Sequence, residues 1–131
     1  MIKKNTKVCI VDYGFGNIAS IENALNYLKF DYNTLKISVD LSNFSHLILP
    51  GVGSFETGIN KLRKSGWESK IKDFVKNGGY LYGICLGMQL LFKYGTNEKT
   101  GKVIEGLGFL DGTCKKFFET NGKKIFVGEK F

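Results

Sequence analysis

The sequence predicts an α/β domain built on a doubly wound, mostly parallel sheet with helices on both faces. Two observations favour this class. Short apolar runs alternate with segments of helical periodicity, and glycine-rich loops follow three of the runs. Strands of a parallel sheet are buried on both faces, so they are nearly all apolar. The chain has 131 residues, of which 43% are hydrophobic, and residues 1–131 are expected to form one domain.

The first half of the chain predicts three strands and a helix. Residues 8–11 are an apolar run that enters a glycine loop. Asn17 is a suitable N-cap for a helix whose apolar residues, Ile18, Ile21, Leu25 and Leu28, recur at helical spacing. Further strands are expected at residues 32–37 and 46–49, and Pro50-Gly51 ends the second of them.

The second half begins with another helical pattern. It starts at Ile59 and Leu62, is interrupted at Ser65-Gly66, resumes at Trp67 and ends at Asn77-Gly78-Gly79. The remaining segments predict a strand at 80–84, a helix at 86–94, a polar loop at 95–106, and strands at 107–118 and 123–127 joined by an Asn121-Gly122 turn.

Composition excludes several classes of function. The net charge of +7 comes from 18 lysines spread along the chain and one arginine, Arg63, and arginine is the residue that bidentate recognition of phosphate or guanine favours. No nucleic-acid partner is therefore expected. No apolar stretch approaches about 18 residues, so no membrane span is expected. Three distant cysteines and a single histidine indicate neither a disulfide framework nor a metal site, and a cytoplasmic protein without a cofactor is expected.

The clearest chemical motif is Gly83-Ile84-Cys85-Leu86-Gly87, between a predicted strand and a predicted helix. It is the cysteine version of the nucleophile elbow, a sharp turn that requires small flanking residues. The helix start would favour the thiolate of Cys85, and the N–H of Leu86 could point at an oxyanion. The alternative interpretation is a buried structural cysteine between two packing glycines.

Two other glycine loops follow predicted strands. The amides of Pro50-Gly51-Val52-Gly53 could complete an oxyanion hole, although an ordinary loop is the alternative. Gly14-x-Gly16-x-x-Ala19 resembles a dinucleotide fingerprint, but no acid ends the second predicted strand, so close helix packing is preferred. Ligands of open α/β sheets bind beyond the carboxyl ends of the strands, where all three loops are expected to meet.

These segments together resemble the class I glutamine amidotransferases, and in particular the glutaminase subunit of imidazole glycerol phosphate synthase. The resemblance covers residues 7 to about 118. Four motifs carry it in the correct order: Asp12-Tyr13-Gly14-x-Gly16-Asn17, Leu47-Ile48-Leu49-Pro50-Gly51-Val52-Gly53-Ser54-Phe55, Gly83-Ile84-Cys85-Leu86-Gly87-Met88-Gln89-Leu90-Leu91-Phe92 and Gly106-Leu107-Gly108-Phe109.

The resemblance implies an activity and a role for each motif. Cys85 would attack the side-chain amide of glutamine, release ammonia and form a glutamyl thioester that water hydrolyses to glutamate. Gly51, Val52, Gly53 and the amide of Leu86 would hold the oxyanion, and Gln89 together with Gly53 would bind glutamine. The ammonia would pass to a (β/α)₈-barrel cyclase subunit in a heterodimer of histidine biosynthesis.

The general base departs from the family pattern. In the family it is the histidine of a His-x-Glu pair near the C-terminus, and this chain has no such pair. His46 begins a predicted strand, about 13 Å from the strand's far end at the usual rise per residue. Glu129 could be the glutamate of such a pair, but the histidine would then have to stand two residues earlier, where the chain has Val127. The segment also comes too early in the family order. Little or no glutaminase activity is therefore expected of this chain.

Two accounts of the missing base remain open. In one, the domain is C-terminally incomplete, which predicts exposed apolar surface and aggregation. In the other, a short relative binds a partner without catalysis through a vestigial elbow, which predicts a soluble and stable protein. A related amidotransferase that supplies ammonia for surface-sugar biosynthesis is a further alternative.

Overall fold

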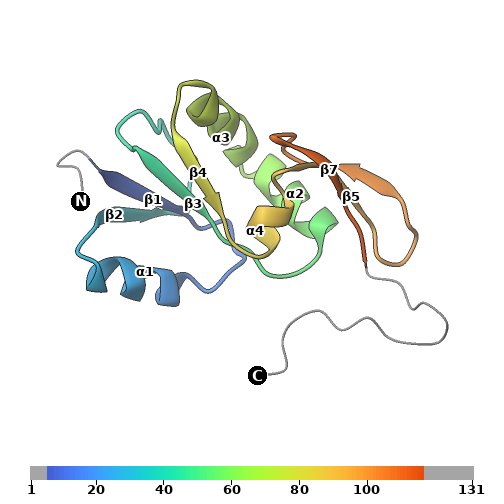
Figure 1. Cartoon of the computed structure of the whole chain (residues 1–131), viewed down its shortest axis with the longest axis horizontal. Coiled ribbons are helices and arrows are strands. Elements are labelled where there is room, and N and C mark those ends of the chain that lie inside the picture. Colours follow the sequence, from blue (N-terminus) through green and yellow to red (C-terminus); the bar gives the residue numbers. More distant parts are fainter. Residues whose placement is uncertain (1–5, 117–131) are drawn as a thin grey trace.

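A four-stranded parallel sheet carries most of the fold (Figure 1). The structure is a computed structural model, and it describes residues 6–116. The strand order is β2-β1-β3-β4, and the bounds are Lys7–Val11 for β1, Asp31–Leu35 for β2, His46–Leu49 for β3 and Tyr80–Gly83 for β4. All three pairings are parallel, so the carboxyl ends of the strands share one edge. The predicted α/β class with a mostly parallel sheet is confirmed.

Helices lie on both faces of this sheet, as predicted (Figure 1). Their bounds are Ile18–Tyr27 for α1, Phe55–Lys64 for α2, Trp67–Lys76 for α3 and Leu86–Gln89 for α4. Because successive strand residues point to opposite faces, Val8 and Ile10 pack against α1, while Cys9 and Val11 belong to the core beneath α2 and α3. No helix among residues 6–116 is long and apolar enough to cross a membrane.

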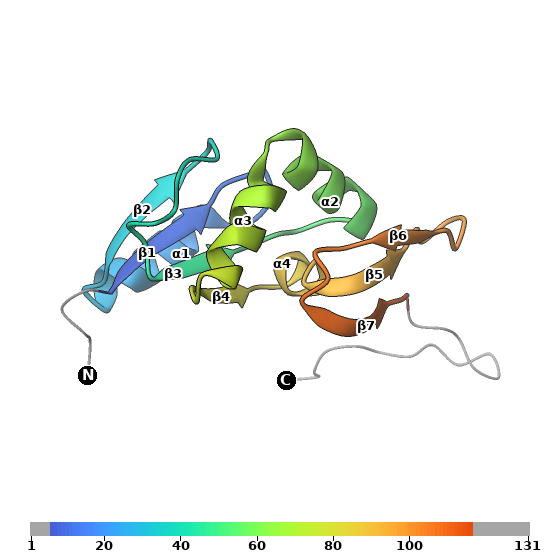
Figure 2. The same ribbon diagram turned by 90° about the horizontal axis from the view of Figure 1, so that it is seen from above.

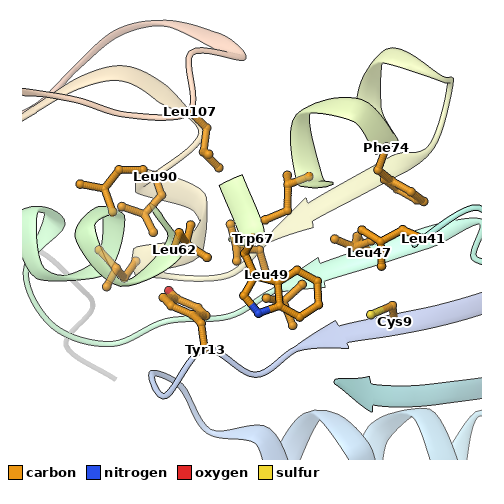
Figure 3. Close-up of a cluster of buried hydrophobic side chains, with 14 of the residues drawn as sticks. Cys9, Tyr13, Leu41, Leu47, Leu49, Leu62, Trp67, Phe74, Leu90 and Leu107 are labelled. Carbon is orange, nitrogen blue, oxygen red and sulfur yellow. The ribbon is translucent and has the colours of Figure 1, made fainter. Parts of the chain in front are cut away.

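The larger core lies between the sheet and the α2–α3 pair (Figure 3). Leu47 and Leu49 of β3 point into it and are fully buried. Ile59 and Leu62 on α2, and Trp67 and Ile71 on α3, meet them there at the helical spacing that the sequence shows, and none has measurable exposure. This core fixes β3 and α2 relative to each other, and the loop between them contains Pro50 to Gly53.

A second sheet follows the short helix α4 (Figure 2). Its strands are Phe92–Thr96 for β5, Val103–Glu105 for β6 and Leu110–Cys114 for β7, in the order β6-β5-β7. The predicted helix at 86–94 is therefore wrong after its first turn, and the predicted loop at 95–106 contains the end of β5 and all of β6. Of the expected strand at 107–118, β7 forms residues 110–114, and the expected Asn121-Gly122 turn and strand at 123–127 lie outside the described residues.

Backbone hydrogen bonds explain why the helix stops early. The carbonyl of Leu90 accepts from Leu107, and that of Leu91 accepts from Phe109 and Leu110. The carbonyl of Lys93 accepts from Gly106 at 2.7 Å. These carbonyls would serve a continued helix, and tertiary pairing with residues 106–110 takes them instead. The apolar run from Leu86 to Phe92 does not distinguish the two outcomes by periodicity.

Part of the sheet's α1 face, on β4, is left exposed by the described helices. Four side chains share this side of β3 and β4, and we call them the tyrosine face: His46, Ile48, Tyr80 and Tyr82. Tyr80 and Tyr82 are 67% and 65% exposed, whereas Val8 and Ile10 on the same side of β1 are buried by α1. β4 is also an edge strand of its sheet. Tyr80 and Tyr82 thus form exposed apolar surface among the described residues; both accounts of the missing base, with the aggregation that one of them expects, stay predictions.

Candidate functional site

Three glycine loops meet at the carboxyl edge of the parallel sheet. A methyl group on Gly16 would lie 2.8 Å from the Cβ of Pro50, and one on Gly51 would lie 2.9 Å from the Cβ of Leu86. The Tyr13 hydroxyl donates to the Pro50 carbonyl at 2.7 Å, a buried bond between the first two loops. The Leu86 N–H donates to the Gly51 carbonyl, which links the second loop to the third. The structure thus brings the predicted loops into direct contact.

Cys85 lies at a sharp turn between β4 and α4. Its backbone has φ 53° and ψ −120°. Residues other than glycine rarely adopt a positive φ of this kind. The flanking glycines explain how the turn fits. A methyl group on Gly83 would lie 2.6 Å from the Cα of Met88, and one on Gly87 would collide with the Leu49 carbonyl. This strained turn between small residues has the backbone form of a nucleophile elbow.

The cysteines differ in their surroundings. Cys85 is exposed, so the interpretation of it as a buried structural cysteine is wrong. Cys9 on β1 is the buried one, and desolvation raises the pKa of its thiol to about 12. Burial also raises the pKa of Cys114, which is half-buried. Cys85 is therefore the thiol most accessible to a reagent or substrate among the described residues.

The candidate oxyanion donors are only partly arranged for that task. The N–H of Leu86 donates to the Gly51 carbonyl at 3.3 Å, a long hydrogen bond that an oxyanion would have to replace. Gly53 has φ +114° with open space around its Cα, and Val52 is exposed. α4 has only four residues, so its dipole is smaller than the predicted nine-residue helix would supply.

Gln89 occupies the end of the same helical turn as Cys85. Its N–H donates to the Cys85 carbonyl at 3.1 Å, and its side chain is exposed. A cavity of about 230 Å³ begins one residue beyond Gly53, at Ser54. Its lining includes Glu56 and Asn97, whose side chains are joined by a hydrogen bond of 2.8 Å. The cavity is not lined by Cys85, Gln89 or Gly53.

The first loop supports packing rather than nucleotide binding. Gly14 and Gly16 have φ +97° and +122°, and the space beside Gly16 is filled by Pro50. Asn17 caps α1 through its side chain, which accepts from the Ser20 N–H at 3.3 Å, as the sequence predicts. The glycines are thus used for a turn and a close approach between loops.

No histidine of the described residues lies at this edge of the sheet. His46 is the first residue of β3, while the loops follow the last residues of the strands. Its Nδ1 is 2.8 Å from the Ser45 hydroxyl, and its ring stacks on Tyr80 at 4.9 Å. Glu129 lies outside the described residues. Within residues 6–116 no group of three or more metal-ligating side chains occurs.

Comparisons with known proteins agree with the motifs. Residues 10–123 match the family described as the CobB/CobQ-like glutamine amidotransferase domain. The chain is 40% identical to imidazole glycerol phosphate synthase subunit HisH of Prochlorococcus marinus subsp. pastoris over 119 residues, which are 91% of this chain and 56% of the relative. It is 45% identical to the same subunit of a Geobacillus species over 103 residues, or 79% of this chain and 47% of the relative.

A plant protein and a solved structure extend these comparisons. The chain is 36% identical to the chloroplastic imidazole glycerol phosphate synthase hisHF of Arabidopsis thaliana, over 90% of this chain and 19% of that protein. A crystal structure of a glutamine amidotransferase shares the fold with a TM-score of 0.67 and 24% identity, over 82% of this chain and 55% of the other.

These relatives confirm the resemblance that the four motifs predict. The chain spans about half the length of the bacterial curated relatives that it matches. On the match over residues 10–123, the chain belongs to the CobB/CobQ-like glutamine amidotransferase domain family.

Proposed function

We propose that this chain is the nucleophile-bearing part of a glutaminase, with Cys85 as the nucleophile. The thiolate sulfur would bond to the side-chain amide carbon of glutamine, and the carbon–nitrogen bond would then break to release ammonia. Water would hydrolyse the thioester to glutamate and regenerate the thiol. The observation that carries this proposal is the exposed Cys85 on a strained turn that only small neighbours permit.

The neighbouring loop would provide the oxyanion hole. When the carbonyl oxygen of glutamine gains negative charge, the Leu86 N–H would turn from the Gly51 carbonyl to that oxygen. Gly51, Val52 and Gly53 would supply the second donor, and the open space around Gly53 supports a rearrangement there. Gln89 and Gly53 would bind glutamine from the two sides of Cys85.

The proton of the thiol needs an acceptor that can return it to the leaving ammonia. No histidine of the described residues can take this role, because His46 lies at the opposite end of β3. We therefore propose that residues 1–131 form one amidotransferase-like domain without the family's His-x-Glu segment, and that this chain alone has little or no turnover.

The names of the relatives support a partner and a pathway. They are subunits of imidazole glycerol phosphate synthase, which favours glutamine as the substrate and histidine biosynthesis as the context. A cyclase subunit of (β/α)₈-barrel type would receive the ammonia in a heterodimer. These names disfavour surface-sugar biosynthesis as the destination of the ammonia.

The nucleophile can be tested separately from turnover. The purified chain would be incubated at neutral pH with a glutamine-like electrophile, and the modified residue would be identified by mass spectrometry. We expect covalent modification at Cys85 that excess glutamine slows, and none at the buried Cys9. Absence of modification at Cys85 would favour a non-catalytic, partner-binding subunit with a vestigial elbow.

Turnover needs a second assay. Glutamate release would be measured for the chain alone and with a cyclase subunit from a bacterial relative, with Cys85→Ala as the control. We expect no release above that control. Release that Cys85→Ala abolishes would contradict the expectation that this chain lacks an effective base, and would leave the assignment of Cys85 intact.

A further inference from the structure

Another cavity lies at the amino end of β3, at the edge of the sheet opposite the glycine loops. Its volume is about 340 Å³, and it lies between residues 40–44 and the side of α3 that carries Lys70, Asp73, Phe74 and Asn77. The last three residues share one side of the helix with Lys70 because they follow it by three, four and seven positions. We call this space the amino-edge cavity. Its volume is typical of pockets that bind small molecules.

Apolar side chains form one wall of the amino-edge cavity. Leu41 and Phe74 are buried in the larger core, and the half-buried Phe44 packs against it. Gly79 leaves room for the Phe74 ring, since a methyl group at this position would collide with it. The Lys7 ammonium lies 5.4 Å from the centre of the Phe44 ring, which is a cation–π distance. The wall is therefore aromatic and held in place by the core.

The charged side chains of the cavity are negative in sum. Asp40 and Asp73 contribute two carboxylates, and Lys70 contributes one ammonium. The Asp40 oxygens accept hydrogen bonds from the N–H and the hydroxyl of Ser42, at 3.0 and 3.1 Å. These bonds and the nearby Lys70 ammonium hold the pKa of Asp40 below its usual value. Asp73 belongs to none of the ion pairs within residues 6–116.

The place of Asp73 in α3 also favours a positive ligand. The residue lies in the last turn of the helix, which ends at Lys76. The carbonyl groups at this end carry partial negative charge, so they repel a carboxylate and attract a cation. A bound cation at Asp73 would relieve this repulsion.

We propose that the amino-edge cavity binds a small organic cation, with its ammonium group at Asp73 and its apolar part against Phe44 and Phe74. The negative sum of charges disfavours an anion, and the aromatic wall favours a ligand with an apolar body over a bare metal ion. The inference does not depend on the proposed chemistry of Cys85, because no residue of the three glycine loops lines this cavity.

Three ligands with the same phenyl group test which charge the cavity accepts. Phenethylamine is the cation, phenethyl alcohol the neutral analogue and phenylpropionate the anion. Each would be titrated at neutral pH into the isotopically labelled 131-residue chain, and binding would be followed by the NMR shifts of the backbone amides of Asn77 and Gly79. We expect saturable shifts with phenethylamine, and binding at least tenfold weaker for the other two ligands.

Substitutions on α3 test where the ammonium group binds. Asp73→Asn should weaken the binding of phenethylamine at least fivefold, whereas Glu105→Gln, at an exposed position of β6 outside the cavity, should change it less than twofold. Lys70→Gln should bind phenethylamine at least as tightly as the parent chain, because it removes a like charge. Lys76→Gln removes the same charge from α3 outside the lining and should match the parent.

Several results would overturn the proposal. Equal or tighter binding of the alcohol or of phenylpropionate would show that the cavity does not select a cation. Weaker binding to Lys70→Gln would indicate recognition of a negative group, and unchanged binding to Asp73→Asn would remove the assigned partner of the ammonium. Absence of saturable binding, or shifts confined to the glycine loops, would exclude a site in this cavity.

Discussion

Gly87→Ala tests whether the elbow depends on a close approach of backbone atoms. A methyl group at position 87 would collide with the Leu49 carbonyl oxygen and lie 2.7 Å from the Leu49 carbonyl carbon and 2.9 Å from the Pro50 oxygen. All three atoms are backbone atoms at the end of β3, so a side-chain rotation cannot relieve the contact. Either the elbow or the loop after β3 has to move.

The size of the effect follows from two opposing contributions. Gly87 lies in α4, where alanine is favoured over glycine by up to about 1 kcal/mol. Overpacking of a well-packed site costs about 1–3 kcal/mol, and rigid neighbours place this site at the upper end. We expect a net loss of about 2 kcal/mol in the free energy of unfolding, with a fall of roughly 5–15 °C in Tm for a domain of this size.

The assay is urea and thermal unfolding followed by far-ultraviolet circular dichroism. Gly101→Ala is the control, because it has a φ of +71° but nothing within 4 Å of the added methyl group. It should lose only about 1 kcal/mol or less, from backbone conformation alone. If Gly87→Ala proves as stable as the parent protein, helix propensity outweighs the collision and the close contact between β3 and the elbow is refuted.

Two further predictions concern Tyr13 and Cys9. Tyr13→Phe should lower the free energy of unfolding by about 1–2 kcal/mol, because the buried Pro50 carbonyl loses its donor. The control is Tyr27→Phe on the exposed side of α1, which should leave the urea midpoint unchanged. Equal urea midpoints for both variants would contradict the prediction. Burial raises the pKa of the Cys9 thiol from 9.0 to about 12 in the folded protein. The thiol of the unfolded chain therefore ionises at lower pH, so the free energy of unfolding should fall as the pH rises from about 9 towards 12. Urea titrations across this range should show the fall, and Cys9→Ala should reduce its slope; an unchanged slope would show that Cys9 does not contribute.

Local sequence patterns predicted the helices and strands that bury one apolar face in the core. The strand at residues 8–11 and the helix from Trp67 are correct, and the helix expected from Ile59 exists but begins earlier, at Phe55. Their apolar residues meet one core at strand or helical spacing. The three loops could be placed together because parallel strands end at one edge. For the same reason, the place of His46 at the start of its strand assigns it to the opposite end of the sheet.

The errors arise where long-range hydrogen bonds decide the conformation. The residues after Gln89 are apolar enough for a helix, and only the pairing of their carbonyls with residues 106–110 makes them a turn and β5. β6 has three residues, too few to show a period. The hydrogen bond from the Leu86 N–H to the Gly51 carbonyl likewise depends on how two loops approach each other. No pattern within either loop encodes that contact.

The position of β4 connects the candidate site with the uncovered face. Cys85 follows an edge strand, so the loop after β3 borders it on one flank, and no strand of the described residues lies beyond the other. In the proposed mechanism, the oxyanion donors would come from the occupied flank, through Gly51 and Gly53. A base that accepts the thiol proton would have to approach from the open flank, because the end of β3 already fills the first. The same strand presents Tyr80 and Tyr82 to solvent. Among the described residues, the exposed tyrosines and the open flank of Cys85 therefore belong to the same edge strand.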